Sequence, residues 1–210
     1  MAIKFKLKKI SDTFLDELYS RAINDLIAFY RFKWVKNQPK VYVLDTREDI
    51  NSAYGKETPA WLVGWSDGRS IYLLNRNNLE RESKHRYSDD FYFKLIKHEM
   101  SHLFFKVITN SDKPSWLNEG VATFISGQLE NSTSIKDFEV FLEDPKEVGS
   151  ALYKEAGYAV KVLIDNFGED ELSNFIKKTK GYKTTGELKS IFKEVFGIPL
   201  EYASFNKLLK

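Results

Sequence analysis

The order of the hydrophobic patterns along the chain is the feature that most constrains its fold. Short apolar runs typical of strands lie in the first part, at 41–44, 61–65 and 70–74, whereas apolar residues at helical spacing dominate from residue 88 onward. Strands in one block and helices in another are typical of α+β folds. We expect a single domain over the whole chain of 210 residues, with a small sheet lobe over about 1–87 and a mainly helical lobe over about 88–210.

The sheet lobe is predicted to begin with a helix and to contain a hairpin. Apolar residues recur at helical spacing over 11–32, and Ser11 or Asp12 can cap that helix. Asp-Gly within the segment 66–69, between two apolar runs, is a hairpin signal. Residues 75–87 are highly polar and are predicted to form a surface loop.

The local residue pattern predicts the structure of two further segments of this lobe. Ile3, Phe5 and Leu7 alternate with lysines, which indicates a half-buried edge strand; a membrane-binding or nucleic-acid-binding arm is the alternative. A polar stretch that contains Gly55 and Pro59 is predicted to connect the first strand to the hairpin.

The helical lobe is divided by glycine and proline. Ser88 or Asp89 can cap its first helix, and Pro114 precedes the next one. Gly197 and Pro199 separate the last two helices. After the first helix, the predicted helical segments are 116–129, 150–167, 170–179, 185–196 and 199–209.

Composition excludes several classes of protein. The formal net charge is only +2, so no concentrated basic face is indicated and we expect no nucleic-acid partner. There is no cysteine, which excludes disulfides, thiolate metal sites and a cysteine nucleophile. No apolar run is long enough to span a bilayer and the first residues lack the apolar core of a signal peptide, so a cytoplasmic protein is expected.

The segment from His98 to His102 carries the strongest chemical signal. It reads His-Glu-Met-Ser-His, and residues four apart lie on one face of a helix, so both imidazoles can point at a common centre. Neutral imidazole is a good zinc ligand, and Glu99 lies near the rim of the same face, where it can activate a water without binding the metal. A structural pair of histidines on an ordinary helix is the alternative. The third histidine, His85, lies in the polar loop and is predicted to be a surface residue.

A third metal ligand is expected on the following helix. Catalytic zinc sites usually have three protein ligands and one water. Glu119 lies in the first turns of the helix that follows Pro114, and an antiparallel return would bring its carboxylate beside His98 and His102. A solvated glutamate is the competing interpretation, because glutamate is usually exposed.

These two motifs resemble those of the gluzincin zinc metallopeptidases. The pair formed by the segment 98–102 and the segment 116–122 (Trp-Leu-Asn-Glu-Gly-Val-Ala) is most similar to small peptidase MA-like domains related to the M1 aminopeptidase core. The resemblance covers about residues 40–205; it also matches the run 71–74 to the edge strand of the active site. It implies a zincin-like fold and one Zn²⁺ ion bound by His98, His102 and Glu119, with Glu99 as general base.

The resemblance also indicates an oxyanion donor and shows departures from the family pattern. Tyr153 lies where M1-like enzymes place a tyrosine that stabilises the oxyanion, and Tyr158 is a rival; packing is the alternative for both. The segment that anchors a substrate amino terminus in M1 aminopeptidases is absent, and 61–65 stands in its place. Thr123 occupies a position where several gluzincins carry an acidic partner for a zinc-bound histidine, so another group must orient that imidazole.

Together these features predict a zinc metallopeptidase that hydrolyses peptide bonds of a peptide or protein substrate. The strand near 70–74 is expected to hold an extended substrate by backbone pairing. The alternative function is a non-catalytic, zinc-containing module that binds peptides or regulates a partner on the same scaffold. A purely structural site does not need the carboxylate of Glu99, which favours the hydrolase. The sequence predicts neither the substrate nor the oligomeric state.

Overall fold

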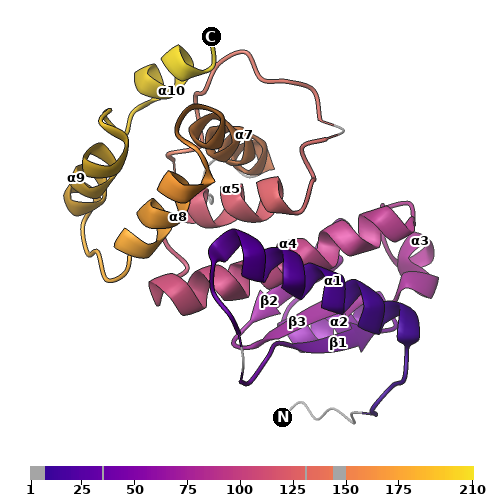
Figure 1. Ribbon diagram of the computed structural model, residues 1–210. Coiled ribbons are helices and arrows are strands. Elements are labelled where there is room, and N and C mark those ends of the chain that lie inside the picture. Colours follow the sequence, from indigo (N-terminus) through magenta and orange to yellow (C-terminus); the bar gives the residue numbers. More distant parts are fainter. Residues whose placement is uncertain (1–7, 35, 131, 144–149) are drawn as a thin grey trace.

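The structure is a computed structural model that describes residues 8–34, 36–130, 132–143 and 150–210. The long helix α4 (Asp89–Thr109) runs through the middle of the molecule, with the sheet on one side and most other helices on the opposite side (Figure 1). The predicted α+β class is confirmed. The strand predicted around Ile3, Phe5 and Leu7 lies outside the described residues.

The elements follow the predicted order, with strands early and helices late. The first part contains α1 (Thr13–Tyr30), β1 (Lys40–Leu44), α2 (Arg47–Tyr54), β2 (Gly64–Asp67), β3 (Ser70–Leu74), a 3₁₀ turn (Arg76–Asn78) and α3 (Leu79–Glu82). After α4 come α5 (Ser115–Ile125), α7 (Ser150–Phe167), α8 (Glu169–Lys178), α9 (Thr185–Phe196) and α10 (Tyr202–Leu208). No helix among the described residues is both long enough and apolar enough to cross a membrane.

The sheet has the order β1-β3-β2 and mixes two pairing directions. β1 pairs with β3 in parallel, and β2 pairs with β3 antiparallel. The hairpin is confirmed, but its turn is tighter than predicted, because Ser66 and Asp67 belong to β2 and pair with β3. Gly68, at φ 60°, makes that turn, a left-handed conformation that glycine adopts without strain. The expectation that the run 71–74 forms the edge strand was wrong: β3 is central, and β2 lies at the edge.

Helix α4 is bounded by caps that the sequence supplies. The Ser88 hydroxyl accepts a hydrogen bond from the Phe91 amide at 3.0 Å, which satisfies one free N–H of the first turn. At the other end, Asn110 adopts the left-handed conformation at φ 60°, and its amide bonds to the Lys106 carbonyl. Buried residues occur all round this helix, which therefore forms the centre of the fold.

Two polar segments predicted to be irregular contain helices. Helix α2 begins with a capping box in which Thr46 and Asp49 exchange side-chain and backbone hydrogen bonds. Its first residue, Arg47, donates to the carbonyl oxygens of Leu62 (2.7 Å) and Glu82 (2.9 Å), which ties α2 to the segment before β2 and to α3. The segment 75–87, predicted to be a loop, contains the 3₁₀ turn and α3, because Leu79 is fully buried and anchors that turn.

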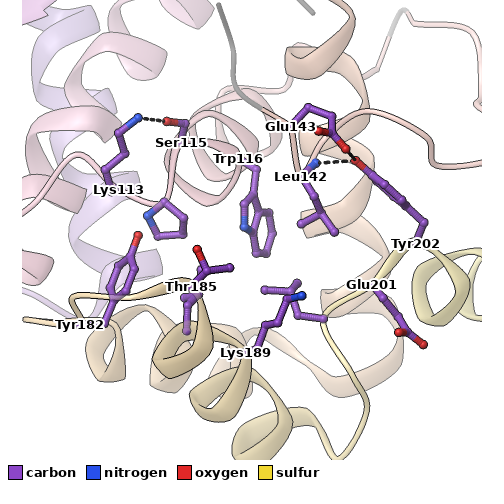
Figure 2. Close-up of a pocket in the computed structure, with 13 residues that line it drawn as sticks. Lys113, Ser115, Trp116, Leu142, Glu143, Tyr182, Thr185, Lys189, Glu201 and Tyr202 are labelled. Atoms are coloured by element: carbon purple, nitrogen blue, oxygen red, sulfur yellow. Dashed lines mark hydrogen bonds between the residues drawn. The ribbon is translucent and has the colours of Figure 1, made fainter. Parts of the chain in front are cut away.

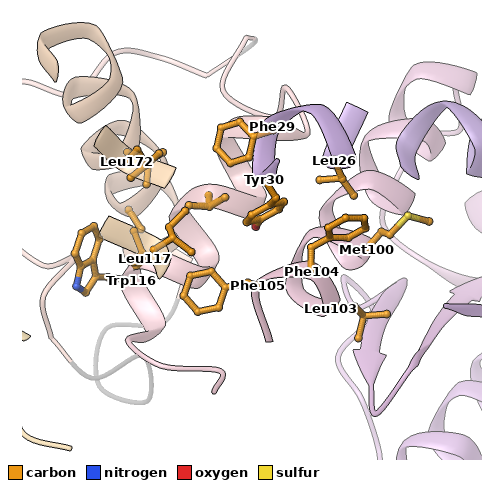
Figure 3. Close-up of a cluster of buried hydrophobic side chains, with 14 of the residues drawn as sticks. Leu26, Phe29, Tyr30, Met100, Leu103, Phe104, Phe105, Trp116, Leu117 and Leu172 are labelled. Carbon is orange, nitrogen blue, oxygen red and sulfur yellow. The ribbon is translucent and has the colours of Figure 1, made fainter. Parts of the chain in front are cut away.

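The core beside α4 is built largely from aromatic rings. Figure 3 shows Phe29 and Tyr30 of α1 beside Phe104 and Phe105 of α4, with Trp116 of α5 on the far side. The rings of Tyr30 and Phe104 stack with centroids 5.6 Å apart. Such pairs add about 0.5–1.5 kcal/mol each beyond the burial of their area. This packing holds α4 in place between the sheet and the later helices.

Candidate metal centre

Helix α4 positions the histidine motif from a buried location. Glu99 is 8% exposed, and the side chains of His98 and His102 are each 13% exposed. Between them, Ser101 is fully buried, and its hydroxyl lies 2.8 Å from the hydroxyl of Tyr30 on α1. The opposite side of the motif is thus attached to α1, which limits rotation of α4 about its axis.

Three side chains converge as predicted. The Nε2 atoms of His98 and His102 lie 3.1 Å apart. The Oε2 atom of Glu119 lies 3.7 Å from the first nitrogen and 3.6 Å from the second. The three residues therefore form a group that can hold a metal ion. The sequence prediction that the helix after Pro114 returns beside α4 is confirmed.

The donor set and its spacing fit zinc. Two ligands at about 2.0–2.1 Å from a tetrahedral ion lie roughly 3.3 Å from one another. The three separations, 3.1, 3.6 and 3.7 Å, are close to that value. Two imidazoles and one carboxylate are a ligand set used by catalytic zinc sites.

Helix α5 holds Glu119 at this point because it packs very closely on α7. A methyl group added at Gly120 would lie 2.4 Å from the Ala156 carbonyl oxygen, so only glycine allows this approach. Burial alone would raise the pKa of Glu119. The charge of His102 and the hydrogen bond and charge of His98 outweigh burial and hold that pKa below its usual range. Glu119 is thus ionised, as a metal ligand must be.

Glu99 has the opposite electrostatic character. Burial raises its pKa to about 7, and the nearby charge of Glu119 adds to this effect. The charge of His102 and a hydrogen bond from Ser66 lower the pKa in part. Two carboxyls in one site therefore ionise in different pH ranges, which is a common basis for separate ligand and proton-transfer roles.

Asn118 is a site residue that the sequence analysis missed. Its Oδ1 atom lies 2.9 Å from Nδ1 of His102, while its Nδ2 atom donates to the Asp112 carbonyl at 3.3 Å. Because an amide oxygen only accepts, Nδ1 of His102 carries the proton, and Nε2 keeps a free lone pair for a metal. The available signal was its place directly before Glu119, at the start of α5.

The other imidazole has no such partner. Nδ1 of His98 is buried and, among the described residues, forms no hydrogen bond. Thr123, which stands at the position of an acidic partner in related motifs, is also buried, and its hydroxyl forms none. We expected a group other than Thr123 to orient a zinc-binding histidine. Asn118 does this for His102, whereas none of the described residues does it for His98.

The two candidate tyrosines lie in different environments. Tyr153 is 37% exposed, and its pKa is raised by burial and by the charges of Glu119 and Glu99. The hydroxyl of Tyr158 lies instead 3.0 Å from the hydroxyl of Ser132. Tyr153 is thus within electrostatic reach of both carboxylates, and Tyr158 has a structural contact.

A cavity of about 240 Å³ opens beside the centre. It lies between the end of β2, the His102 side of α4 and the start of α5; Asp67, Lys106 and Asp112 line its polar wall. His85 has no part in the centre: its Nε2 atom lies 2.8 Å from the Trp61 carbonyl, and its ring packs on Phe91.

Comparisons with known proteins add no assignment. No model of a known protein family matches the chain, and a search of curated proteins finds no match. Function must therefore be inferred from the chemistry of this centre.

Proposed function

We propose that the protein is a zinc-dependent metallopeptidase that hydrolyses peptide bonds, with one Zn²⁺ ion held by His98, His102 and Glu119. The observation that carries this proposal is the convergence of two imidazole nitrogens and one carboxylate oxygen beside the buried carboxyl of Glu99. Three protein ligands leave a tetrahedral ion one open position, as in catalytic zinc sites. Structural zinc sites are instead usually closed by four protein ligands.

Glu99 is the proposed general base and then proton donor. When bound, zinc supplies a Lewis acid that lowers the pKa of a water molecule toward about 7 and polarises a carbonyl group. Glu99 takes a proton from the attacking water and passes it to the leaving amine. Without a metal ion, burial raises the pKa of Glu99 to about 7, and a bound cation lowers it toward the ionised form that a base requires.

Tyr153 is the proposed oxyanion donor. The charges of Glu119 and Glu99 act on this tyrosine and raise its pKa, and the residue is 37% exposed. That hydroxyl donates a hydrogen bond to the carbonyl oxygen of the scissile bond as negative charge develops there. The hydroxyl of Tyr158 is already in contact with Ser132, which removes it from this role.

The substrate is proposed to lie along β2. In the described part of the chain, β2 pairs only with β3, so its outer edge presents backbone groups to an extended peptide. β2 also carries Ser66, which donates a hydrogen bond to Glu99, so a peptide on this edge passes beside the catalytic carboxyl. This placement replaces the one expected near 70–74, because β3 is paired on both sides.

The test is the Glu99→Gln variant, with Glu17→Gln on the exposed face of α1 as the matched control. Zinc content is measured by inductively coupled plasma mass spectrometry. Cleavage is measured as new peptide termini in a panel of unfolded polypeptides. We expect one zinc ion per chain in all three proteins, and cleavage by the wild type and Glu17→Gln only. Unchanged turnover in Glu99→Gln would remove the proposed base.

The same experiment separates the competing functions. A wild-type protein that binds zinc and binds polypeptides saturably, yet produces no new termini, would be a non-catalytic zinc-containing module. A protein that takes up no zinc on titration and shows no thermal shift would be a metal-free helical domain. Either result would refute the proposed peptidase.

A further inference from the structure

A second cavity, lined by none of the residues that line the first, lies where the start of α5 meets α9 and α10. It encloses about 600 Å³, a volume typical of small-molecule sites. Its walls are the first turn of α5, the first turns of α9 and the residues around Tyr202 at the start of α10, with Leu142 and Glu143 on one side (Figure 2). No metal ligand and no catalytic residue of the proposed peptidase lines it.

The floor of this cavity contains an unsatisfied hydrogen-bond donor. The Trp116 side chain is 4% exposed, and its indole N–H has no acceptor among the described residues. Figure 2 shows the nitrogen-bearing edge of the ring facing the side where Tyr182 and Thr185 lie. A buried donor without a partner costs about 1–3 kcal/mol, so a ligand oxygen that reaches this N–H, after a small movement of the exposed Thr185, recovers a lost interaction.

Two helices begin at the same side of the cavity, and one of them makes it electropositive. Helix α5 begins with Ser115 after Pro114, which provides no side-chain cap, so the first backbone N–H groups of this helix lack that partner. Helix α9 begins with Thr185 at the same wall, but its start is capped by Thr184 and carries the acidic Glu187 in its first turn. The positive end of the α5 dipole, which has neither, favours an anion here.

Lysines add full charge to this dipole. Lys113 and Lys189 line the cavity, and neither forms an ion pair with any described residue. The Nζ atom of Lys113 donates to the Ser115 hydroxyl at 2.7 Å. Glu143 and Glu201 also line the cavity, and the Glu143 carboxylate accepts a hydrogen bond from Tyr202 at 2.8 Å (Figure 2).

We propose that this cavity binds a small organic carboxylate with an apolar body. The carboxylate lies against the start of α5, between Lys113 and Lys189, with one oxygen directed at the indole N–H of Trp116. The apolar body packs on Leu142, Leu188 and Leu200, whose side chains line the rest of the cavity. The proposal is independent of the peptidase function, because it uses none of the residues of the metal centre.

The test follows the Trp116 indole N–H resonance in the full-length protein by ¹⁵N–¹H NMR. The chain has four tryptophans, so Trp34→Phe, Trp61→Phe and Trp65→Phe assign the Trp116 peak by elimination even if Trp116→Phe does not fold. The probe is N-acetyl-L-leucine, and the control compound is N-acetyl-L-leucinamide, which lacks the charge. We expect a saturable shift of this peak with the acid and none with the amide.

A pair of variants on α9 tests the role of charge. Lys189→Ala removes a lysine that lines the cavity, whereas Lys193→Ala removes an exposed lysine one turn further along that does not line it. We expect Kd for N-acetyl-L-leucine to rise about tenfold in Lys189→Ala and to stay unchanged in Lys193→Ala. An unmoved Trp116 peak, an equal response to the amide, or equal effects of the two variants would overturn the proposal.

Discussion

Replacing Glu99 by glutamine should stabilise the metal-free protein at alkaline pH and leave its stability unchanged at acid pH. The carboxyl is buried, and burial raises its pKa from 4.5 to about 7. Glutamine has nearly the same shape but no charge. The variant therefore removes the cost of burying an ionised carboxylate and keeps most of the packing.

The sign follows from proton binding in the two states. Between pH 4.5 and 7, the folded protein keeps a proton on Glu99 that the unfolded chain has released, so stability falls as pH rises through this window. Below pH 4.5, both states are protonated and the carboxyl imposes no such cost. Above pH 7, both states have lost the proton. The folded and unfolded pKa values of Glu99 differ by about 2.5, which corresponds to about 3 kcal/mol of lost stability in the wild type. The Glu99→Gln variant does not lose this free energy.

The assay is unfolding by urea in the presence of a metal chelator, at pH 4.5 and at pH 8. The free energy of unfolding is compared among wild type, Glu99→Gln and the exposed control Glu17→Gln. We expect Glu99→Gln to exceed wild type by up to about 3 kcal/mol at pH 8 only, and Glu17→Gln to match wild type at both values. Equal stabilities at pH 8, or a glutamine variant less stable than wild type there, would refute the electrostatic description of this site.

Three other substitutions test other parts of the account. Asn118→Ala removes the acceptor that orients His102, and zinc affinity measured by competition with a chelator should fall about 10–100-fold; unchanged affinity would refute this role. Tyr153→Phe should lower kcat by about 10²–10³ without loss of zinc, whereas Tyr158→Phe should not lower it; equal effects would contradict the assignment. Gly120→Ala places a methyl group 2.4 Å from a carbonyl of α7 and should lower the free energy of unfolding by about 3 kcal/mol, whereas Gly186→Ala, whose methyl group would meet its nearest neighbour at 3.8 Å, should not; equal stabilities would contradict the close packing of α5.

The spacing of the apolar residues and the residues that cap helices were sufficient to predict most of the fold. The helix over 11–32, the strand at 41–44 and the helix capped by Ser88 all form, because in each the burial pattern and the end signals agree. Helix α2 was missed because only Ile50 of its residues is buried, so it has almost no apolar pattern. Its capping residues, Thr46 and Asp49, were the readable signal.

Tertiary pairing was the part that sequence could not determine. The two runs predicted to form the hairpin, 61–65 and 70–74, are both short and apolar, so their pattern does not show which of them receives β1 as a neighbour. The parallel pairing of β1 with β3 makes β2 the edge strand and reverses the expected place of the substrate. The three candidate metal ligands were predictable because two of them lie one turn apart on one helix and the third lies on the next helix, which packs back against the first. The role of Asn118 depends on a side-chain contact between the two helices.

The most direct test of the central claim is an anomalous diffraction map, recorded at the zinc absorption edge, from crystals of the protein grown with zinc. The account predicts one peak at about 2.0–2.1 Å from Nε2 of His98, from Nε2 of His102 and from a carboxylate oxygen of Glu119, with a fourth position free of protein atoms. A peak elsewhere, a fourth protein ligand, or a Glu119 side chain turned to solvent would contradict it.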